Sequence, residues 1–125
     1  LTDMLEFYKH QVAEFWVHEY GDPRKPEQRV WIKKWSPYHY PIDKNTSHPA
    51  LYYETALHDA RVSPLHAFKM VARLESEVST WKGPLLLRTM TKTGHQSSNL
   101  TKAEIAKSVA EYYTFFAKEL GLKTT

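Results

Sequence analysis

The sequence predicts an α/β fold built on two parallel strands with flanking helices. Residues 50–57 and 85–91 are short runs of mainly apolar and aromatic side chains, preceded by proline and followed by polar residues, which is typical of strands. A helical pattern of apolar residues follows each run. Because strands that alternate with helices form parallel sheets, this order predicts that the two strands run in the same direction.

The N-terminal part of the chain is predicted to be partly helical. Residues 1–20 carry apolar side chains at partly helical spacing but lack a strong N-cap. Pro26 suits the first position of a helix, and a short amphipathic helix is expected to run from there to Trp35. It should end before Ser36-Pro37, because the residue preceding a proline is pushed out of the helical region.

A polar connection, residues 38–49, leads into the first strand, and a helix is predicted after that strand. Ser63 offers an N-cap and Pro64 suits the first helical position. Apolar residues then recur at the spacing of an amphipathic helix, namely Leu65, Phe68, Val71, Leu74 and Val78.

The helix predicted after the second strand has signals at both ends. Thr101 and Glu104 match a capping box, in which each side chain satisfies the backbone N–H of the other residue. Gly121 is the expected stop residue. Between these ends one apolar face is predicted, made of Ile105, Val109, Tyr112, Phe116 and Leu120.

Charged and polar residues follow both predicted strands. His58, Asp59 and Arg61 come directly after the first strand, and His95 follows the second. In open α/β sheets ligands bind at the carboxyl ends of the strands, so this edge is the candidate site. An aspartate followed by a histidine is also the order in which α/β hydrolases present the last two members of their triad, after a serine on an earlier strand. The alternative is an ordinary surface turn with an Asp–Arg pair.

Composition excludes several classes of protein. The 125 residues are enough for one domain or part of one, and 42% of them are hydrophobic, as in a globular chain. No cysteine is present, so neither a disulfide framework nor a thiol nucleophile is possible.

No apolar run of about 18 residues occurs and the first residues lack a signal-peptide pattern, so we expect a cytoplasmic protein without a membrane partner. The net charge of +3 is small and dispersed, which does not indicate a nucleic-acid partner.

Five short motifs resemble a known family in their order and spacing. They are Asp3-Met4-Leu5 with Phe7, Trp16 with Glu19-Tyr20-Gly21, Ser36-Pro37 with His39, His58-Asp59-Ala60-Arg61-Val62 with Pro64-Leu65-His66, and Gly94-His95. Together they resemble the C-terminal part of the catalytic domain, an α/β-hydrolase fold, of the prolyl oligopeptidase family of serine peptidases. The chain departs from the family's pattern at Gln96-Ser97-Ser98-Asn99, where the family has a small turn containing glycine and lysine.

The resemblance implies a role for each residue at the strand ends. His95 would take a proton from a serine and pass it to the leaving amine, and Asp59 would hold the other ring nitrogen of His95. Arg61 would hold a carbonyl oxygen of the substrate, although a simple ion pair with Asp59 or Glu54 is the alternative. The activity implied is that of a serine-type endopeptidase without a cofactor, which hydrolyses short peptides after proline.

The resemblance also implies a pocket for the proline of the substrate. Trp16 would form the floor of this pocket by stacking its indole on the proline ring. Tyr20 and Val62 would lie beside it. The alternative for Trp16 is an ordinary core residue, since large aromatic side chains usually pack in cores.

The seven histidines do not indicate a metal site. His58, His66 and His95 with Asp59 could be drawn as a zinc set, but the His-x3-His spacing that helices use for zinc is absent. We expect His58 and His66 to be structural, with His66 bonding locally in the first turn of its helix.

The chain lacks the motif that carries a serine nucleophile. A nucleophile elbow needs Gly-x-Ser-x-Gly, and the glycines of this chain, at positions 21, 83, 94 and 121, include no pair four positions apart. The serine, the oxyanion-hole segment and the family's gating propeller are therefore expected upstream of residues 1–125. The expected partner is that upstream segment, or a second copy that pairs through an exposed sheet edge. The alternative is a non-catalytic binding or interaction module of hydrolase ancestry.

Overall fold

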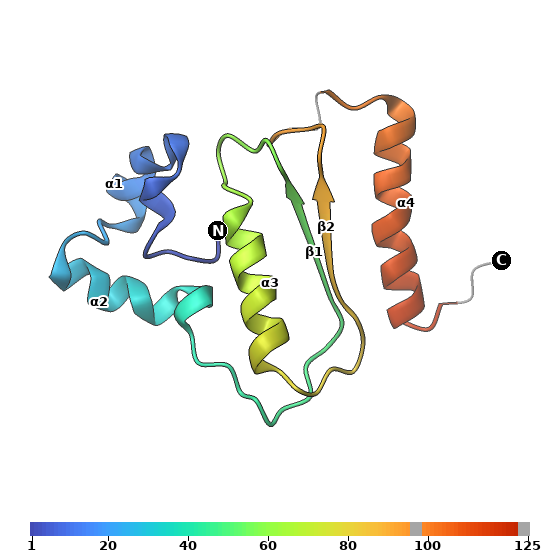
Figure 1. Ribbon diagram of the computed structural model, residues 1–125, viewed down its shortest axis with the longest axis horizontal. Coiled ribbons are helices and arrows are strands. Elements are labelled where there is room, and N and C mark those ends of the chain that lie inside the picture. The colour runs from blue at the N-terminus through green and yellow to red at the C-terminus, as the bar shows by residue number, and fades with distance from the viewer. Residues whose placement is uncertain (96–98, 123–125) are drawn as a thin grey trace.

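The computed structural model describes residues 1–95 and 99–122 (Figure 1). In chain order the elements are the 3-10 helices η1 (Phe7–Lys9) and η2 (Gln11–Trp16), helices α1 (Val17–Tyr20) and α2 (Pro26–Trp35), the 3-10 helix η3 (Pro37–His39), strand β1 (Leu51–Ala56), helix α3 (Leu65–Glu77), strand β2 (Leu85–Met90) and helix α4 (Lys102–Glu119). Within the described residues, no helix combines the length and the apolar character needed to cross a bilayer.

β1 and β2 form the predicted parallel pair, with Leu51 opposite Leu85 and Ala56 opposite Met90. The ladder continues past β1, where the N–H of Leu57 donates to the carbonyl of Met90 at 2.8 Å. Both strands therefore end at the same edge of the sheet, as the α/β prediction requires. The sequence departs from the family's pattern at residues 96–99. Of these, residues 96–98 lie outside the part of the chain that the structure describes.

α3 connects the two strands and packs against the sheet (Figure 1). The core between them consists of Met70, Leu74 and Val78. Partly buried side chains from η3, the strands and the adjoining loops pack against this core, namely Tyr38, Ile42, Leu51, Tyr53, Trp81 and Leu85. We refer to residues 48–122, which carry this core, as the strand–helix region.

The start of α3 corrects the prediction by one residue. Pro64 is the N-cap and not the first helical residue, because its carbonyl accepts the first helical hydrogen bond, from the N–H of Phe68 at 3.0 Å. The hydroxyl of Ser63 accepts instead from the N–H of Leu65 at 3.3 Å. Leu65 is exposed, so the packed face of α3 starts one position later, at His66 and Ala67.

α4 has both predicted end signals. The capping box of Thr101 and Glu104 is present. At the other end Gly121 has a φ of +68°, and the hydrogen bonds from Gly121 N–H to Lys118 and from Leu122 N–H to Ala117 complete a Schellman motif. Glycine suits this position because residues with a Cβ atom rarely adopt a positive φ.

The predicted apolar face of α4 is not the face that contacts the sheet. Phe116 is 49% exposed, and Ile105 and Leu120 are also exposed. α4 approaches the sheet through the ring contact between Tyr52 and Phe115 and through the ion pair between Arg88 and Glu111. An amphipathic pattern shows that one face is apolar, but it does not show which neighbour that face meets.

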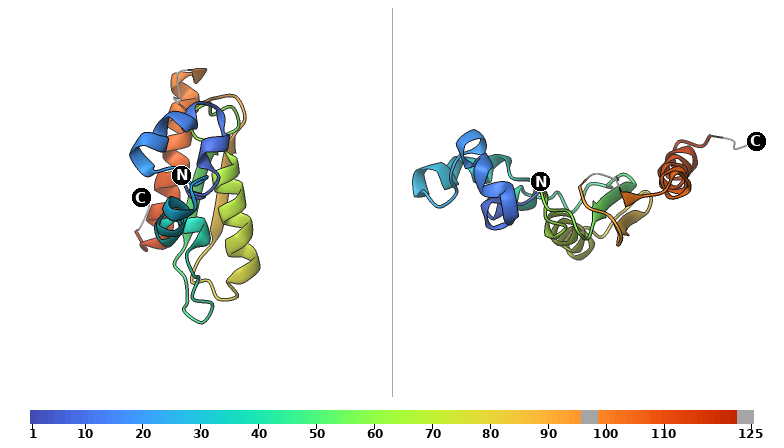
Figure 2. Two further views of the ribbon diagram at one scale, coloured as in Figure 1. Left: turned by 90° about the vertical axis from the view of Figure 1, so that its left-hand side faces the viewer. Right: turned by 90° about the horizontal axis from the view of Figure 1, so that it is seen from above.

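The N-terminal region, residues 1–40, has its own core of Met4, Leu5, Phe7, Ala13 and Ile32. Four partly buried side chains pack on it, namely Tyr8, Trp16, Val17 and Tyr20. α2 has the predicted bounds, with Pro26 in its first turn and extended backbone at Ser36. Seen from above, this region, α3 with the sheet, and α4 follow one another along the long axis of the molecule (Figure 2).

Candidate active site

The structure brings Asp59 and His95 together at the C-terminal edge of the sheet. Nδ1 of His95 lies 2.9 Å from Oδ2 and 3.1 Å from Oδ1 of Asp59. Asp59 lies three residues beyond β1 and His95 five residues beyond β2, so the two loops converge where the parallel strands end. An ordinary surface turn with only an Asp–Arg pair, the alternative considered, does not describe this site, because the carboxylate of Asp59 contacts the imidazole of His95.

The loop after β1 holds the carboxylate of Asp59 in place. Its Oδ1 accepts hydrogen bonds from the backbone N–H groups of Arg61 and Val62, both at 2.9 Å. Burial alone would raise the pKa of Asp59, but the hydrogen bonds from Val62, His95 and Arg61 outweigh it and lower the pKa below its ordinary value. The side chain is therefore a fixed anion at neutral pH, with its carboxylate directed at His95.

The loop after β2 depends on a glycine. The N–H of His58 donates to the carbonyl of Thr93 at 3.4 Å, which joins the two loops. A Cβ atom on Gly94 would lie 2.9 Å from the carbonyl oxygen of His58, closer than such contacts normally allow. In the sequence, Gly94 stands out only as part of a motif with His95. The close approach to His58 that requires glycine is visible only in the folded chain.

The geometry of the pair suits proton transfer by His95. Because Nδ1 faces the carboxylate, the other ring nitrogen, Nε2, lies on the opposite side of the ring. The side chain of His95 is 40% exposed, so a reacting group can approach Nε2. A carboxylate at Nδ1 fixes the tautomer and stabilises the imidazolium that forms when Nε2 takes a proton.

Arg61 does not pair with a carboxylate in the described part of the chain. Its backbone N–H donates to Asp59, whereas Glu54, the other partner considered, pairs with Arg88 at 3.3 Å. The side chain of Arg61 is exposed and that of Val62 is partly buried. The alternative of a simple ion pair is wrong for Arg61, and its guanidinium can donate to a ligand.

Trp16 and Tyr20 lie together in the N-terminal region. Their ring centroids are 6.3 Å apart, and the ring of Tyr20 also contacts Phe7 and Trp35. Trp16 is partly buried against the N-terminal core, so it packs on that core and also presents surface. Within residues 1–95 and 99–122, no hydrogen bond or ring contact links these two side chains directly to Asp59 or His95.

A second group of serine, histidine and aspartate, which the sequence analysis did not identify, lies in the N-terminal region. Ser36 Oγ is 2.9 Å and Asp3 Oδ1 is 3.7 Å from His39, but both contacts use the same nitrogen, Nδ1. A triad needs the two partners on different nitrogens, and Ser36 is completely buried. Burial is also the main reason that the pKa of His39 is lowered. This group is therefore structural.

The amino-acid sequence matches a known protein family over almost its whole length. Residues 1–123 match the family described as the prolyl oligopeptidase family. The chain belongs to the prolyl oligopeptidase family. It is 41% identical over 123 residues to a prolyl oligopeptidase of Omphalotus olearius and 31% identical over 125 residues to a prolyl endopeptidase of Elizabethkingia meningoseptica. The matches cover 98% and 99% of this chain but only 16% and 17% of those proteins, so the chain spans a small part of its relatives' length.

Solved structures of the prolyl oligopeptidase family agree with this assignment. Prolyl oligopeptidase B of Galerina marginata superposes with a TM-score of 0.91 at 30% identity, over 99% of this chain and 17% of that one. A post-proline cleaving enzyme of Rickettsia typhi superposes with a TM-score of 0.83 at 28% identity, over 98% of this chain and 17% of that one. The structure thus corresponds to part of the α/β-hydrolase domain of these peptidases.

Proposed function

We propose that this chain is the Asp/His-bearing part of a serine peptidase that hydrolyses short peptides after proline. The observation that carries the proposal is the contact of Asp59 with Nδ1 of His95 at the C-terminal edge of a parallel sheet. In a family of peptidases, a histidine oriented in this way serves as the general base for a serine.

The proposed reaction uses both nitrogens of His95. Nε2 takes the proton from the serine as its oxygen attacks the scissile carbonyl, and later gives that proton to the leaving amine. Asp59 stabilises the imidazolium between these two steps. Water then hydrolyses the acyl-enzyme by the same proton route. Because this chain has no Gly-x-Ser-x-Gly, the serine comes from another segment of the complete enzyme and the chain alone is inactive.

The substrate is proposed to contact both regions of the chain. The exposed guanidinium of Arg61 donates to a carbonyl oxygen of the peptide, which its fixed donor geometry suits. Trp16 stacks on the proline ring, and Tyr20 and Val62 contact its sides. These assignments rest on the family motifs together with the exposure of Arg61 and the packing of Trp16 against Tyr20.

Relatives support the proposed chemistry. Solved structures of the Galerina marginata enzyme include variants in which a serine, a histidine or an aspartate is replaced by alanine. The serine and histidine variants are bound to a substrate of both hydrolysis and macrocyclization, and the aspartate variant is bound to a macrocyclization substrate. In that enzyme the aspartate precedes the histidine, as Asp59 precedes His95 here. For the protein that contains the present chain, we propose hydrolysis after proline.

Labelling with a fluorophosphonate, which reacts with activated serines, tests this proposal. The longer protein that contains this chain should be labelled and should release a chromophore from a proline–chromophore peptide, whereas the purified 125-residue chain should do neither. The chain should instead bind the serine-bearing segment or self-associate through the open edge of β1, which sedimentation at micromolar concentration detects. A longer protein that is folded but neither labelled nor active would favour the non-catalytic binding module. Labelling of the chain itself would contradict the assignment of the serine to another segment.

A further inference from the structure

The N-terminal region and the strand–helix region have separate apolar cores. The first is built around Phe7 and Ile32 and the second around Met70, Leu74 and Val78, and no residue belongs to both. One aromatic ring crosses from the first region, since Tyr38 packs on the second core. The regions also meet at the ring contact of His10 with His66 and at polar contacts, among them the hydrogen bond from the guanidinium of Arg73 to the carbonyl of Tyr38. We call the set of Asp3, His66 and Lys69, with the backbone groups that they bind, the polar joint.

His66 is the most specific part of the polar joint. Its side chain is only 4% exposed, and its Nδ1 accepts the backbone N–H of Asp3 at 3.1 Å. Its carbonyl accepts the hydroxyl of Thr2 at 2.6 Å. We expected the ring of His66 to bond locally, but its partner, Asp3, lies 63 residues earlier, near the N-terminal end of the described chain. Because Nδ1 accepts a hydrogen bond, the ring is neutral with its proton on Nε2.

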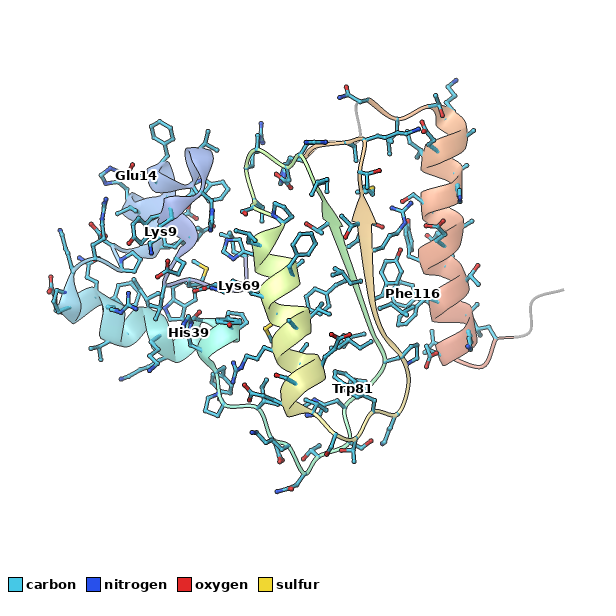
Figure 3. All side chains as sticks on the ribbon, viewed as in Figure 1. Lys9, Glu14, His39, Lys69, Trp81 and Phe116 are labelled. Atoms are coloured by element: carbon cyan, nitrogen blue, oxygen red, sulfur yellow. The ribbon has the colours of Figure 1, made fainter. Side chains whose placement is uncertain are left out.

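Lys69 and Asp3 form the second part of the polar joint. Asp3 is 1% exposed, and one of its oxygens accepts the N–H of Leu5 at 3.1 Å while the other pairs with Nζ of Lys69. Nζ of Lys69 also lies 4.5 Å from the centre of the Tyr38 ring. In Figure 3, Lys69 lies on the side of α3 that faces the N-terminal region, toward His39. A buried carboxylate needs such partners, since leaving it unpaired costs several kcal/mol.

The two sides of the polar joint lead to different parts of the proposed site. Asp3 directly precedes Met4 and Leu5 of the N-terminal core, on which Trp16 and Tyr20 pack. On the other side, the N–H of His66 donates to the carbonyl of Ser63 at 3.1 Å. Ser63 directly follows Val62, whose N–H holds the carboxylate of Asp59. Hydrogen bonds, short chain segments and core packing therefore connect the proposed proline pocket with Asp59 and His95.

We propose that His66 and Lys69 are positioning residues that set the place of the Trp16–Tyr20 pocket relative to Asp59 and His95. This inference rests on the proposed function, because it concerns where the substrate's proline is held with respect to the reacting carbonyl. Apolar contacts are non-directional and allow two packed surfaces to shift. Hydrogen bonds have fixed directions and lengths. The polar joint thus determines an alignment that the two separate cores leave adjustable.

Two substitutions in the complete enzyme test this proposal, His66→Leu and Lys69→Met. Each should raise KM for a proline–chromophore peptide and lower kcat/KM by about tenfold to a hundredfold, since misplacement by about 1 Å has effects of this size. A small alkyl fluorophosphonate does not need the proline pocket, so its rate of reaction with the serine should stay within about threefold of wild type. Lys107→Met, which removes an exposed surface pair with Glu111, is the matched control and should change neither rate.

A conservative substitution separates positioning from general damage. In His66→Asn the amide oxygen can replace Nδ1 as the acceptor for Asp3, so kcat/KM should recover to within about threefold of wild type. If labelling falls in parallel with peptide hydrolysis, or if kcat/KM is unchanged in Lys69→Met, the proposal is overturned. Should His66→Leu fail to fold, Lys69→Met decides the question alone. Failure of the proposed function looks different, because the wild-type enzyme itself would then not be labelled.

Discussion

The two regions of this molecule position their side chains by different means. In the strand–helix region, Asp59 and His95 lie together because two parallel strands end at one edge and the following loops converge. In the N-terminal region, Trp16 and Tyr20 lie together because short helices pack their aromatic rings on a small core. A site placed by strand ends follows from backbone topology, whereas a site placed by packing depends on the shapes of many neighbours. Asp59 and His95 should therefore act mainly on kcat, and Trp16 and Tyr20 mainly on KM.

The largest effect should come from Asp59→Asn in the complete enzyme. The amide favours the wrong tautomer of His95, so kcat should fall about ten-thousandfold while KM changes little, by analogy with the aspartate of other triads. Steady-state kinetics on a proline–chromophore peptide measure both constants. A variant within tenfold of wild type would show that Asp59 orients no catalytic base, and the contrast between the two regions would then be lost.

Gly94→Ala should have the next largest effect. The added Cβ would meet the carbonyl oxygen of His58 at 2.9 Å, so the loop must shift and carry His95 with it. A displacement of about 1 Å should lower kcat about a hundredfold.

Gly121→Ala is the matched control for Gly94→Ala. Gly121 has a positive φ but open space around its Cβ position, so the variant should lose about 1–2 kcal/mol of stability and no activity. Equal kcat values for the two variants, measured alongside thermal unfolding, would contradict the role of loop contact at Gly94.

Trp16→Ala tests the N-terminal region. Loss of the stacking surface should reduce transition-state binding of proline substrates by about 1–3 kcal/mol, seen mainly as a higher KM. Trp81→Ala is the comparison, because Trp81 packs on the core of the strand–helix region and should lower the melting temperature without changing proline preference. If Trp16→Ala lowers the melting temperature strongly and the preference for proline survives, Trp16 is only a core residue.

The remaining expected effect is a dependence of stability on pH. Burial, aided by the positive charge of Lys69, lowers the pKa of His66 to about 4, and Asp3 opposes this shift. A lowered pKa means that the unfolded chain binds the proton more readily, so the stabilisation is present above the ordinary histidine value of about 6.5. It is lost as the pH falls toward 4.

Urea unfolding at several pH values measures this dependence. His66→Asn, which has no ring to titrate, should show a weaker loss of stability between pH 6.5 and 4 than wild type. Parallel curves for the two proteins would assign the pH dependence to other groups.

Local patterns in the sequence were sufficient to predict most of the backbone. The two strands, the capping box at Thr101, the stop at Gly121 and the start of α2 at Pro26 all depend on residues close to one another in sequence. The convergence of Asp59 and His95 also follows from local information, because parallel strands must end at a common edge. These features are decided by backbone geometry, which varies little between proteins.

The tertiary structure alone decided the contacts between elements. Nothing near His66 in sequence indicates that its ring would accept a hydrogen bond from the backbone N–H of Asp3. Likewise, nothing near Gly94 indicates that its Cα would approach the carbonyl oxygen of His58 so closely that a Cβ atom would not fit. The apolar stripe of α4 likewise did not indicate that Glu111 and Phe115, which lie outside that stripe, would contact Arg88 and Tyr52 of the sheet. Such contacts join residues that are far apart in the chain, and their geometry depends on how whole elements pack. The sequence by itself thus determined the elements and the edge where the candidate site lies, while packing determined how the N-terminal region sits against the strand–helix region.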